Sequence, residues 1–174
     1  MNIEDHIRDI PDFPKPGIIF KDITPLLANA EALAYVVDKM VERYKGRNIS
    51  HVVGVESRGF LFGTAMAKGL GVGFVPIRKK GKLPADTIHK TYELEYGEAT
   101  VEIHKDALTS DHHVVLIDDL LATGGTLEAA ADLIQRTGAS VEEIWVLVEL
   151  AFLGGRDKLD GYDIHSELII GPKK

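Results

Sequence analysis

Residues 114–126 decide the fold of this chain: Val114-Val115-Leu116-Ile117-Asp118-Asp119-Leu120-Leu121-Ala122-Thr123-Gly124-Gly125-Thr126. The apolar residues that open this stretch predict a strand buried on both faces, as the strands of parallel sheets are. Two acidic residues, Asp118 and Asp119, stand where this strand is expected to end, and a Thr-Gly-Gly-Thr turn follows. From Thr126 to Arg136, apolar residues recur at helical spacing. The stretch therefore predicts a strand, a tight turn and a helix in succession.

The turn and the two acids together indicate a site for a sugar phosphate. A helix N-terminus reached through glycines offers unpaired N–H groups and the positive end of the helix dipole to an anion. Carboxylates beside it accept hydrogen bonds from hydroxyl groups. The alternative is the Walker B strand of a P-loop enzyme, which also ends in Asp-Asp. That alternative needs a G-x-x-x-x-G-K-[ST] loop, whereas the only Gly-Lys pair, Gly81-Lys82, is followed by Leu83.

Composition limits the class of protein. With 174 residues, 45% of them hydrophobic and 27% charged, the chain fits one globular domain with a full core. A chain without cysteine has no disulfides and no thiolate metal sites, which fits a cytoplasmic location. The net charge of −7 argues against nucleic acid as the main partner. No apolar run is long enough to span a bilayer and the N-terminus does not resemble a signal peptide, so we expect no membrane partner.

Alternating strand and helix patterns predict an α/β architecture. Tyr92, Leu94 and Tyr96 alternate with Glu93 and Glu95, and a second alternating run follows Gly97, which predicts an antiparallel hairpin with one wet face. His112-His113 is placed on a solvated turn. The expected helices cover residues 3–10, 29–44 (capped by Asn29), 60–68 and 126–136, and the expected core strands cover 49–55, 72–77, 114–118, 141–150 and 164–170.

Two further stretches carry chemistry. Residues 54–60, Gly-Val-Glu-Ser-Arg-Gly-Phe, lie between a predicted strand and a predicted helix, where ligands bind in open α/β sheets. The alternative is an ordinary connection with an exposed Arg58. Residues 78–82, Arg-Lys-Lys-Gly-Lys, place four cations in five positions of an acidic chain. A solvated loop is the usual explanation of such a run, and a site for a polyanion is the sharper alternative.

Residues 117–126 resemble the phosphoribosyl-diphosphate (PRPP) motif of the type I phosphoribosyltransferases. The resemblance implies that Asp118 and Asp119 hold the 2′- and 3′-hydroxyls of ribose. It also implies that the turn Ala122, Thr123, Gly124, Gly125 and Thr126 wraps the 5′-phosphate.

Residues 54–60 resemble the pyrophosphate loop of the adenine phosphoribosyltransferases in that family. This implies that Glu56, Ser57 and Arg58 bind diphosphate, and that the Glu56–Ser57 peptide bond is a candidate for the cis form. The basic loop implies that Arg78, Lys79 and Lys82 also reach diphosphate, partly from the neighbouring subunit of a homodimer. Mg²⁺ is then the expected cofactor, carried by PRPP and without direct protein ligands.

Two more stretches resemble parts of the same enzymes. Residues 92–97 resemble a flexible hood, in which Glu95 corresponds to the acid that handles the proton on the attacking purine nitrogen; a solvated carboxylate is the alternative. With Glu95, Arg58 is the second catalytic candidate. Residues 13–27 resemble the adenine-binding hood, in which backbone groups of Ile19 and Lys21 pair with adenine and Phe20 and Leu120 enclose the ring. A proline-rich surface loop is the alternative for this segment.

The resemblance spans nearly the whole chain, with its motifs in matching order. It implies a type I phosphoribosyltransferase-like, mostly parallel sheet flanked by helices, with a hairpin flap and a small N-terminal hood. We expect a single domain over residues 1–174, with a hood over 1–28 and a core over 29–174 that includes a flexible flap at about 78–104. The implied activity, part of purine salvage, makes AMP and diphosphate from adenine and PRPP. A transferase for a 6-oxopurine or orotate, and a PRPP-sensing module without enzymatic activity, remain as alternatives.

Overall fold

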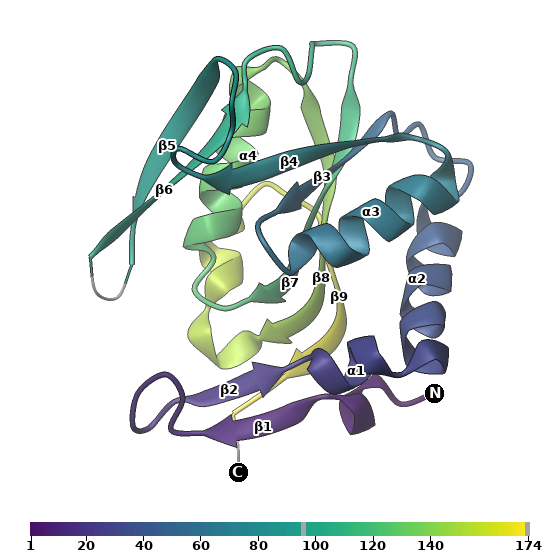
Figure 1. The fold of residues 1–174 in the computed structure, drawn as a ribbon, viewed down its shortest axis with the longest axis vertical. Coiled ribbons are helices and arrows are strands. Elements are labelled where there is room, and N and C mark those ends of the chain that lie inside the picture. The colour runs from purple at the N-terminus through teal and green to yellow at the C-terminus, as the bar shows by residue number, and fades with distance from the viewer. Residues whose placement is uncertain (95–96, 173–174) are drawn as a thin grey trace. The chain divides into compact units, whose positions relative to one another are not determined.

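The computed structural model describes residues 1–94 and 97–172 of the chain (Figure 1). The chain divides into two compact units, Met1–Lys45 and Gly46–Lys174. In the part of the chain that the structure describes, no helix is long and apolar enough to cross a membrane.

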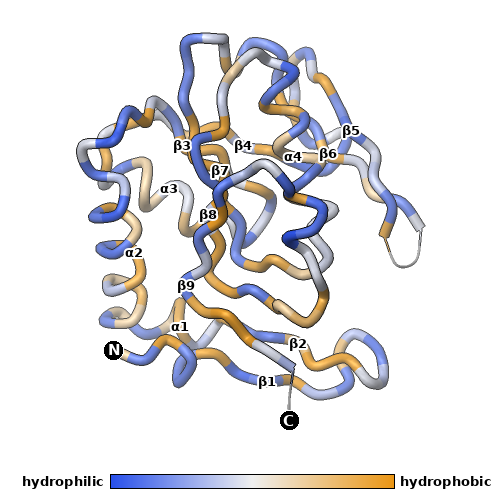
Figure 2. The backbone as a smooth tube through the Cα atoms, turned by 180° about the vertical axis from the view of Figure 1, so that it is seen from behind, coloured by the Kyte–Doolittle hydropathy of each residue, from blue (hydrophilic) through white to orange (hydrophobic). Residues whose placement is uncertain are grey.

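The N-terminal unit contains a small antiparallel sheet and two helices. Its elements are η1 (Ile3–His6), β1 (Arg8–Pro11), β2 (Ile19–Asp22), α1 (Thr24–Ala28) and α2 (Ala30–Tyr44). The predicted cap of α2 is confirmed, because the side chain of Asn29 accepts a hydrogen bond of 2.9 Å from the backbone N–H of Ala32. Hydrophobic and hydrophilic residues alternate along the turns of α2, as an amphipathic helix requires (Figure 2).

The helix predicted over residues 3–10 is wrong beyond its first turn. A short 3₁₀ helix, η1, ends at His6, and the chain then runs extended in β1. Ile10 lies opposite Phe20 in an antiparallel register that continues through Arg8 and Asp22. Three isoleucines at helical spacing are a weak signal, and pairing with β2 outweighs it here.

The C-terminal unit is built on a seven-stranded sheet in the order β5-β6-β4-β3-β7-β8-β9. Its strands are β3 (His51–Val55), β4 (Gly73–Lys79), β5 (Thr87–Glu93), β6 (Glu98–His104), β7 (His113–Leu121), β8 (Ser140–Leu150) and β9 (Ile164–Ile170). Its helices are α3 (Gly59–Leu70) and α4 (Gly125–Arg136), with 3₁₀ turns η2 (Ala151–Leu153) and η3 (Gly155–Leu159) after β8. Strands β4, β3, β7, β8 and β9 run parallel, and β5 and β6 run antiparallel. The predicted mostly parallel sheet is confirmed.

Helices α3 and α4 cover opposite faces of this sheet. Successive side chains of a strand point to opposite faces, so Val53 packs in one core cluster with Leu127 of α4. The neighbouring Val52 lies on the α3 side, where Phe62 contacts Trp145 with their ring centroids 5.8 Å apart. The buried strands β7 and β8 are largely hydrophobic along their length (Figure 2).

The topology places a crevice between β3 and β7. From β3 the chain continues to β4 on one side of the sheet, and from β7 it continues to β8 on the other side. The loops that follow β3 and β7 therefore diverge to opposite faces, although the two strands pair side by side from His51–Val114 to Gly54–Ile117. Ligands of open α/β sheets bind at such a switch point, beyond the carboxyl ends of the strands.

The predicted antiparallel hairpin is confirmed as β5 and β6, which pair from Thr87–His104 to Glu93–Glu98, but its first strand begins five residues earlier than the alternation from Tyr92 predicted. Between described residues, β6 joins β4 at Arg78–Glu102 and Lys79–Val101. The hairpin is also tied to α4. Its ties are a 2.9 Å hydrogen bond from Arg136 to the carbonyl of His89, an ion pair of 3.6 Å between Lys90 and Asp132, and a 3.0 Å hydrogen bond between the hydroxyls of Tyr92 and Thr126.

The turn predicted for His112-His113 is confirmed for His112, whose backbone N–H donates to the carbonyl of Thr109, and is wrong for His113. His113 begins β7, and its backbone N–H donates to the hydroxyl of Ser50. The ring of His112 packs against that of His51, with centroids 4.3 Å apart. Residues 110–113 are all polar, so the hydrophobic pattern indicates the strand only from Val114 onward.

Candidate active site

A cavity of about 410 Å³ lies where β3 and β7 end. This volume is within the usual range for sites that bind small molecules. Many of the predicted site residues line it: Glu56, Ser57, Arg58, Lys79, Asp118, Asp119, Leu120 and residues 122–126. The sequence motifs from the two loops thus meet in one place, as the topology requires.

The Thr-Gly-Gly-Thr turn forms one wall of the cavity. Gly124 precedes α4 with a φ of +85°, a backbone conformation that glycine adopts without strain, and α4 begins at Gly125. The turn therefore presents the N-terminus of a twelve-residue helix to the cavity. This is the arrangement that binds phosphate through backbone N–H groups and the helix dipole.

The two acids lie within β7 and not after its end. The strand continues to Leu121, with Leu120 paired to Val148 and Leu121 to Glu149 of β8. The expectation that the strand ends at Asp118 is therefore wrong, because pairing with the long strand β8 extends it to Leu121. Both Asp118 and Asp119 nevertheless line the cavity.

Burial and the neighbouring carboxylate of Asp119 raise the pKa of Asp118 well above its ordinary value. Burial also raises the pKa of Asp119, although the guanidinium of Arg58 acts in the opposite direction. Burial is the main cause in both cases, and the like charge of the neighbour adds to it for Asp118. The ionised forms of the two carboxyl groups are therefore unfavourable, and hydrogen-bond donors from a ligand would stabilise them.

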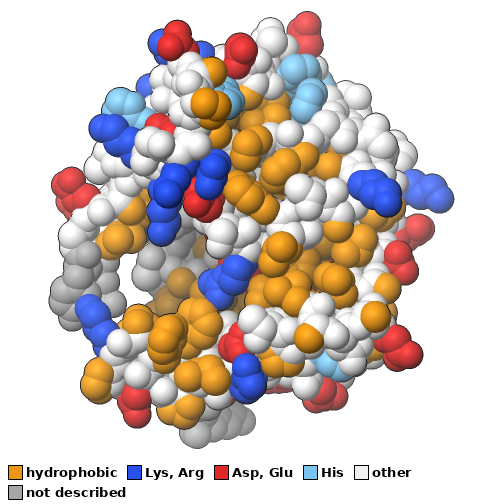
Figure 3. Space-filling view, viewed as in Figure 1, with side chains coloured by type: hydrophobic (Ala, Val, Ile, Leu, Met, Phe, Trp, Pro, Cys, Tyr) orange, Lys and Arg blue, Asp and Glu red, His pale blue; other side chains and the backbone are white. Residues whose placement is uncertain are grey.

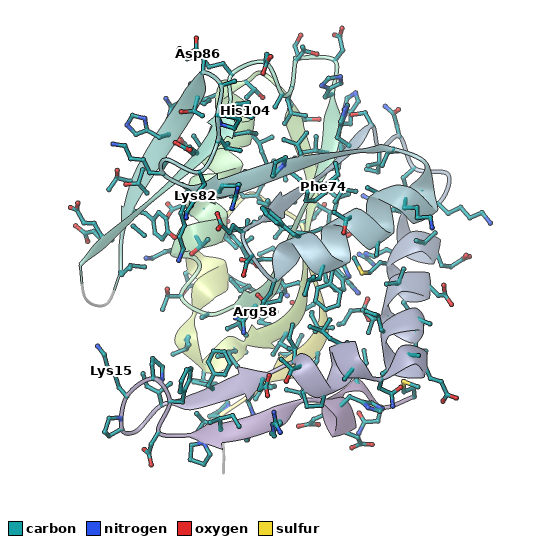
Figure 4. All side chains as sticks on the ribbon, viewed as in Figure 1. Lys15, Arg58, Phe74, Lys82, Asp86 and His104 are labelled. Atoms are coloured by element: carbon teal, nitrogen blue, oxygen red, sulfur yellow. The ribbon has the colours of Figure 1, made fainter. Side chains whose placement is uncertain are left out.

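Arg58 connects the two loops of the cavity. It precedes α3, and its Nε lies 2.9 Å from Oδ2 of Asp119, whose side chain is 7% exposed. Figure 4 shows Arg58 at the start of α3 and Lys82 beside the C-terminal end of β4. The predicted diphosphate loop and the predicted ribose acids are thus joined by an ion pair, which the sequence did not indicate.

The Glu56–Ser57 peptide bond is cis, the form for which the resemblance made it a candidate. The carboxylate of Glu56 accepts a hydrogen bond of 3.1 Å from Nε of Arg78 and one of 3.0 Å from the backbone N–H of Lys79. Burial raises the pKa of Glu56, but these hydrogen bonds outweigh it and the pKa lies below its ordinary value. Glu56 therefore stays ionised and anchors the end of β4.

The members of the basic loop take different positions. Lys79 lines the cavity, whereas Arg78 and Lys82 are not among the described lining residues. Arg78 turns to Glu56 and also donates to the carbonyl of Lys82. In the space-filling view, lysine and arginine side chains gather over the end of β4 and near the start of α3 (Figure 3).

Glu102 supports the basic loop, and the sequence pattern did not indicate this. The alternation of the hairpin put it on the wet face, but it is 4% exposed. Its carboxylate accepts hydrogen bonds from the backbone N–H groups of Gly81 (3.1 Å) and Leu83 (3.0 Å). These contacts hold the basic loop in place. In the sequence, the only indication of them is an acidic residue in the hairpin and a glycine in the basic loop.

Tyr92 was also missed. It lines the cavity, and its ring lies 3.3 Å from the position that a Cβ of Gly125 would take. The sequence could not show which face of the hairpin meets α4.

Three of the predicted residues belong to the N-terminal unit, a compact unit of its own. Ile19, Phe20 and Lys21 belong to β2 in the N-terminal unit, where Phe20 meets Phe13 edge to face at 5.2 Å. Lys21 forms an ion pair with Asp9. The catalytic candidate Glu95 lies outside the described residues.

No group of three or more His, Asp or Glu side chains among the described residues is arranged to hold a metal ion. Asp118 and Asp119 are the adjacent carboxylates in the cavity. Mg²⁺ commonly binds to one or two carboxylates together with substrate phosphates and waters. The residues present therefore fit a magnesium ion that a phosphorylated substrate brings with it.

The model of the phosphoribosyl transferase domain matches residues 20–170. A curated adenine phosphoribosyltransferase from Methylobacillus flagellatus is 58% identical over 159 residues, covering 91% of this chain and 90% of that protein. Another from Proteus mirabilis is 54% identical, covering 97% of this chain and 92% of that protein.

Solved structures agree with these sequence matches. The adenine phosphoribosyltransferase of Thermoanaerobacter pseudethanolicus matches with a TM-score of 0.93 and 54% identity, covering 97% of this chain and 98% of that one. The enzyme of Saccharomyces cerevisiae, in complex with an imino-altritol bisphosphate and adenine, matches with a TM-score of 0.89 and 39% identity, covering 94% and 95%. The chain therefore belongs to the phosphoribosyltransferase family and, within it, groups with the adenine phosphoribosyltransferases.

Proposed function

We propose that this chain transfers the 5-phosphoribosyl group of PRPP to adenine, giving AMP and diphosphate. One observation carries the proposal: a single cavity is lined by the Thr-Gly-Gly-Thr turn, by the acids Asp118 and Asp119 and by the loop 56–58. A phosphate, a diol and a diphosphate are the three recognition elements of PRPP, and each has a matching wall.

In the reaction, the bond between C1 of ribose and the diphosphate oxygen breaks and a bond from C1 to N9 of adenine forms. The proton on N9 is lost. The turn Thr123–Thr126 binds the 5′-phosphate through its amides, and Asp118 and Asp119 accept hydrogen bonds from the ribose hydroxyls. Because the ion pair with Asp119 holds Arg58 at the cavity, Arg58 stands ready to contact diphosphate.

Negative charge grows on the leaving diphosphate as the C1–O bond breaks. Cations already in place stabilise that charge more in the transition state than in the ground state. Lys79 at the cavity supports this role, and Ser57 and Glu56 belong to the same wall. Mg²⁺ bound to the diphosphate would supply further neutralisation of the leaving group.

We assign the base to the N-terminal hood. Backbone groups of Ile19 and Lys21 pair with the amino edge of adenine, Phe20 and Leu120 enclose its ring, and Glu95 handles the N9 proton. Support comes from the resemblance of residues 13–27 and 92–97 and from the adenine bound by the yeast relative. A carbonyl that accepts from an amino group would meet the oxygen of a 6-oxopurine acceptor to acceptor, at a cost of about 1–3 kcal/mol.

We further propose one phosphoribosyltransferase domain, a homodimer and a cytoplasmic location. The family match runs from residue 20 to 170 and so covers parts of both compact units. Leu61 of α3 is 48% exposed and offers apolar surface to a second copy. The absence of cysteine supports a reducing compartment. Arg78 and Lys82 would then meet diphosphate at the assembled site.

Release of diphosphate from PRPP, measured with adenine, hypoxanthine or orotate as the base, tests the activity. We expect release with adenine and Mg²⁺, little with the other bases, and loss of PRPP binding in Asp119→Asn. Release with hypoxanthine or orotate instead would show a transferase for another base. Binding of PRPP without release on any base would show a sensor and refute the proposal.

A further inference from the structure

The segment that follows β8 packs its backbone directly against the phosphate turn. A Cβ added to Gly155 would lie 2.3 Å from the carbonyl oxygen of Ala122, and one added to Gly124 would lie 2.4 Å from the carbonyl oxygen of Gly155. Both distances are shorter than real Cβ atoms tolerate, so the two glycines allow the backbones to meet. In Figure 1 the yellow-green turns η2 and η3, which we call the buttress (residues 151–159), lie beside the start of α4.

A cluster of three side chains fixes the buttress to the sheet. Nε and one terminal nitrogen of Arg156 each lie 2.7 Å from a carboxylate oxygen of Glu149, which is a bidentate pair. The hydroxyl of Ser166 on β9 donates to the same carboxylate at 2.5 Å. The side chain of Glu149 is 5% exposed and that of Arg156 is 44% exposed, so a buried carboxylate is paired with a guanidinium that still contacts water.

The position of Glu149 in the sheet brings the cluster close to the phosphate turn. It pairs with Leu121 in the sheet register, and Leu121 directly precedes Ala122. Arg156 directly follows Gly155. The ion pair therefore joins the end of β8, which is paired with the end of β7, to the buttress residue that follows Gly155. Gly155 in turn contacts the phosphate turn.

We propose that Glu149, Arg156 and Ser166 are positioning residues that hold the phosphate turn in the conformation that binds the 5′-phosphate of the substrate. The inference rests on the proposed function. None of the three side chains is among the described residues that line the cavity, so they act through Gly155 and not by touching the ligand. Backbone amides bind phosphate well only when they converge, and the glycines of the turn do not by themselves restrain it.

The test compares Arg156→Ala with a matched control at the other end of β8. There Arg47 lies 3.6 Å from Glu143, whose side chain is 8% exposed. Arg47→Ala thus also removes an arginine from a buried glutamate of the same strand, but far along the strand from the turn. Both variants are expected to lower the melting temperature.

We expect Arg156→Ala to raise KM for PRPP and weaken binding of ribose 5-phosphate by about 5- to 10-fold, as for one lost or misaligned hydrogen bond to phosphate. KM for adenine should stay unchanged, and Arg47→Ala should leave the PRPP values at wild type. Arg156→Lys keeps the charge but not the bidentate geometry, so it should fall between wild type and Arg156→Ala. Ser166→Ala should show a smaller effect of the same kind.

Different outcomes separate the two proposals. If the wild-type protein transfers ribosyl groups but Arg156→Ala matches Arg47→Ala in PRPP and ribose 5-phosphate affinity, the cluster only stabilises the fold and the inference is refuted. If Arg156→Ala does not fold, an unchanged ribose 5-phosphate affinity in both Arg156→Lys and Ser166→Ala refutes it equally. If the wild-type protein binds neither PRPP nor ribose 5-phosphate, the proposed function fails, and the inference with it.

Discussion

Replacing Asp118 by asparagine should make the protein more stable and at the same time a weaker binder of PRPP. The carboxyl group of Asp118 sits against the start of α3, where a Cβ on Gly59 would lie 3.1 Å from its Oδ1. Oδ1 also accepts a hydrogen bond of 2.9 Å from the backbone N–H of Asp119. Asparagine keeps this acceptor and the shape of the side chain, removes the charge, and replaces the other carboxylate oxygen by an NH2 donor.

The gain in stability follows from the raised pKa. Burial and the neighbouring Asp119 make the ionised form of Asp118 costly in the folded state. Each pKa unit above the unfolded value corresponds to about 1.4 kcal/mol lost once the pH exceeds the folded-state pKa. For a chain of this size 1 kcal/mol shifts the melting temperature by about 2–4 °C. We therefore expect Asp118→Asn to melt above wild type near neutral pH, because the cost of ionising Asp118 in the folded state is removed.

The loss of binding follows from the weaker acceptor. A hydrogen bond to a charged group contributes about 1.5–3 kcal/mol, and one between neutral groups about 0.5–1.5 kcal/mol. The difference of about 1–2 kcal/mol predicts about 5- to 30-fold weaker binding of PRPP. Titration calorimetry with PRPP and with ribose 5-phosphate measures this loss directly.

The pH dependence gives the sharpest check. A carboxyl group whose folded-state pKa is raised loses no stability below its unfolded pKa, and loses it progressively as the pH rises towards the folded-state value. The melting temperatures of wild type and Asp118→Asn should therefore converge as the pH falls towards 3.8. Asp106→Asn, at an exposed turn after β6, is the control and should change neither property. A variant that melts below wild type near neutral pH, or a difference that does not change with pH, would refute the reasoning.

Three further predictions concern other parts of the molecule. Gly59→Ala would place a Cβ 2.9 Å from the carbonyl oxygen of Ile117; overpacking of this kind costs about 1–3 kcal/mol, which urea denaturation should show, and an unchanged midpoint would contradict the close packing. Tyr92→Phe removes the 3.0 Å hydrogen bond to the hydroxyl of Thr126, so KM for PRPP should change by about 2- to 10-fold while the fold is kept; steady-state kinetics beside circular dichroism would reveal either failure. The pKa of Asp22 is lowered to about 2, chiefly by the backbone N–H of Thr24; its stabilising effect should be lost as the pH falls through about 2, and an NMR titration with an ordinary midpoint would disprove this.

The parallel core was predictable because its signals are local and strong. Val114 to Ile117 form an unbroken apolar run, and the helix after Gly124 has clear amphipathic spacing, so strand, turn and helix follow from the residues themselves. The cap at Asn29 is similarly local. The prediction was wrong where an element depends on a pairing partner elsewhere in the chain. Strand β1 was predicted as helix, and its extended form depends on pairing with β2.

The walls of the cavity were predictable as motifs but not as contacts. Asp119 and Glu56 were both identified, yet the partners Arg58 and Arg78 of these two acids arise from the order of the strands, which a single sequence does not display. Glu102 shows the same difficulty from the other side. Strand alternation places it correctly on a face, but only the fold reveals that the basic loop covers that face.

The hairpin β5–β6 is fastened to the molecule through α4 as well as through the sheet edge, and this limits how it can be re-engineered. At the sheet edge, Arg78 pairs with Glu102 and Lys79 with Val101, and the backbone N–H of Lys80 donates to the carbonyl of Thr100 at 3.0 Å. Partners for Arg136, Asp132 and Thr126 all lie on its first strand. A graft that exchanges residues 87–104 for the hairpin of another protein would preserve the sheet edge yet leave these helix contacts unmatched. Any chimaera that exchanges the hairpin should therefore transplant it together with the α4 side chains that contact it.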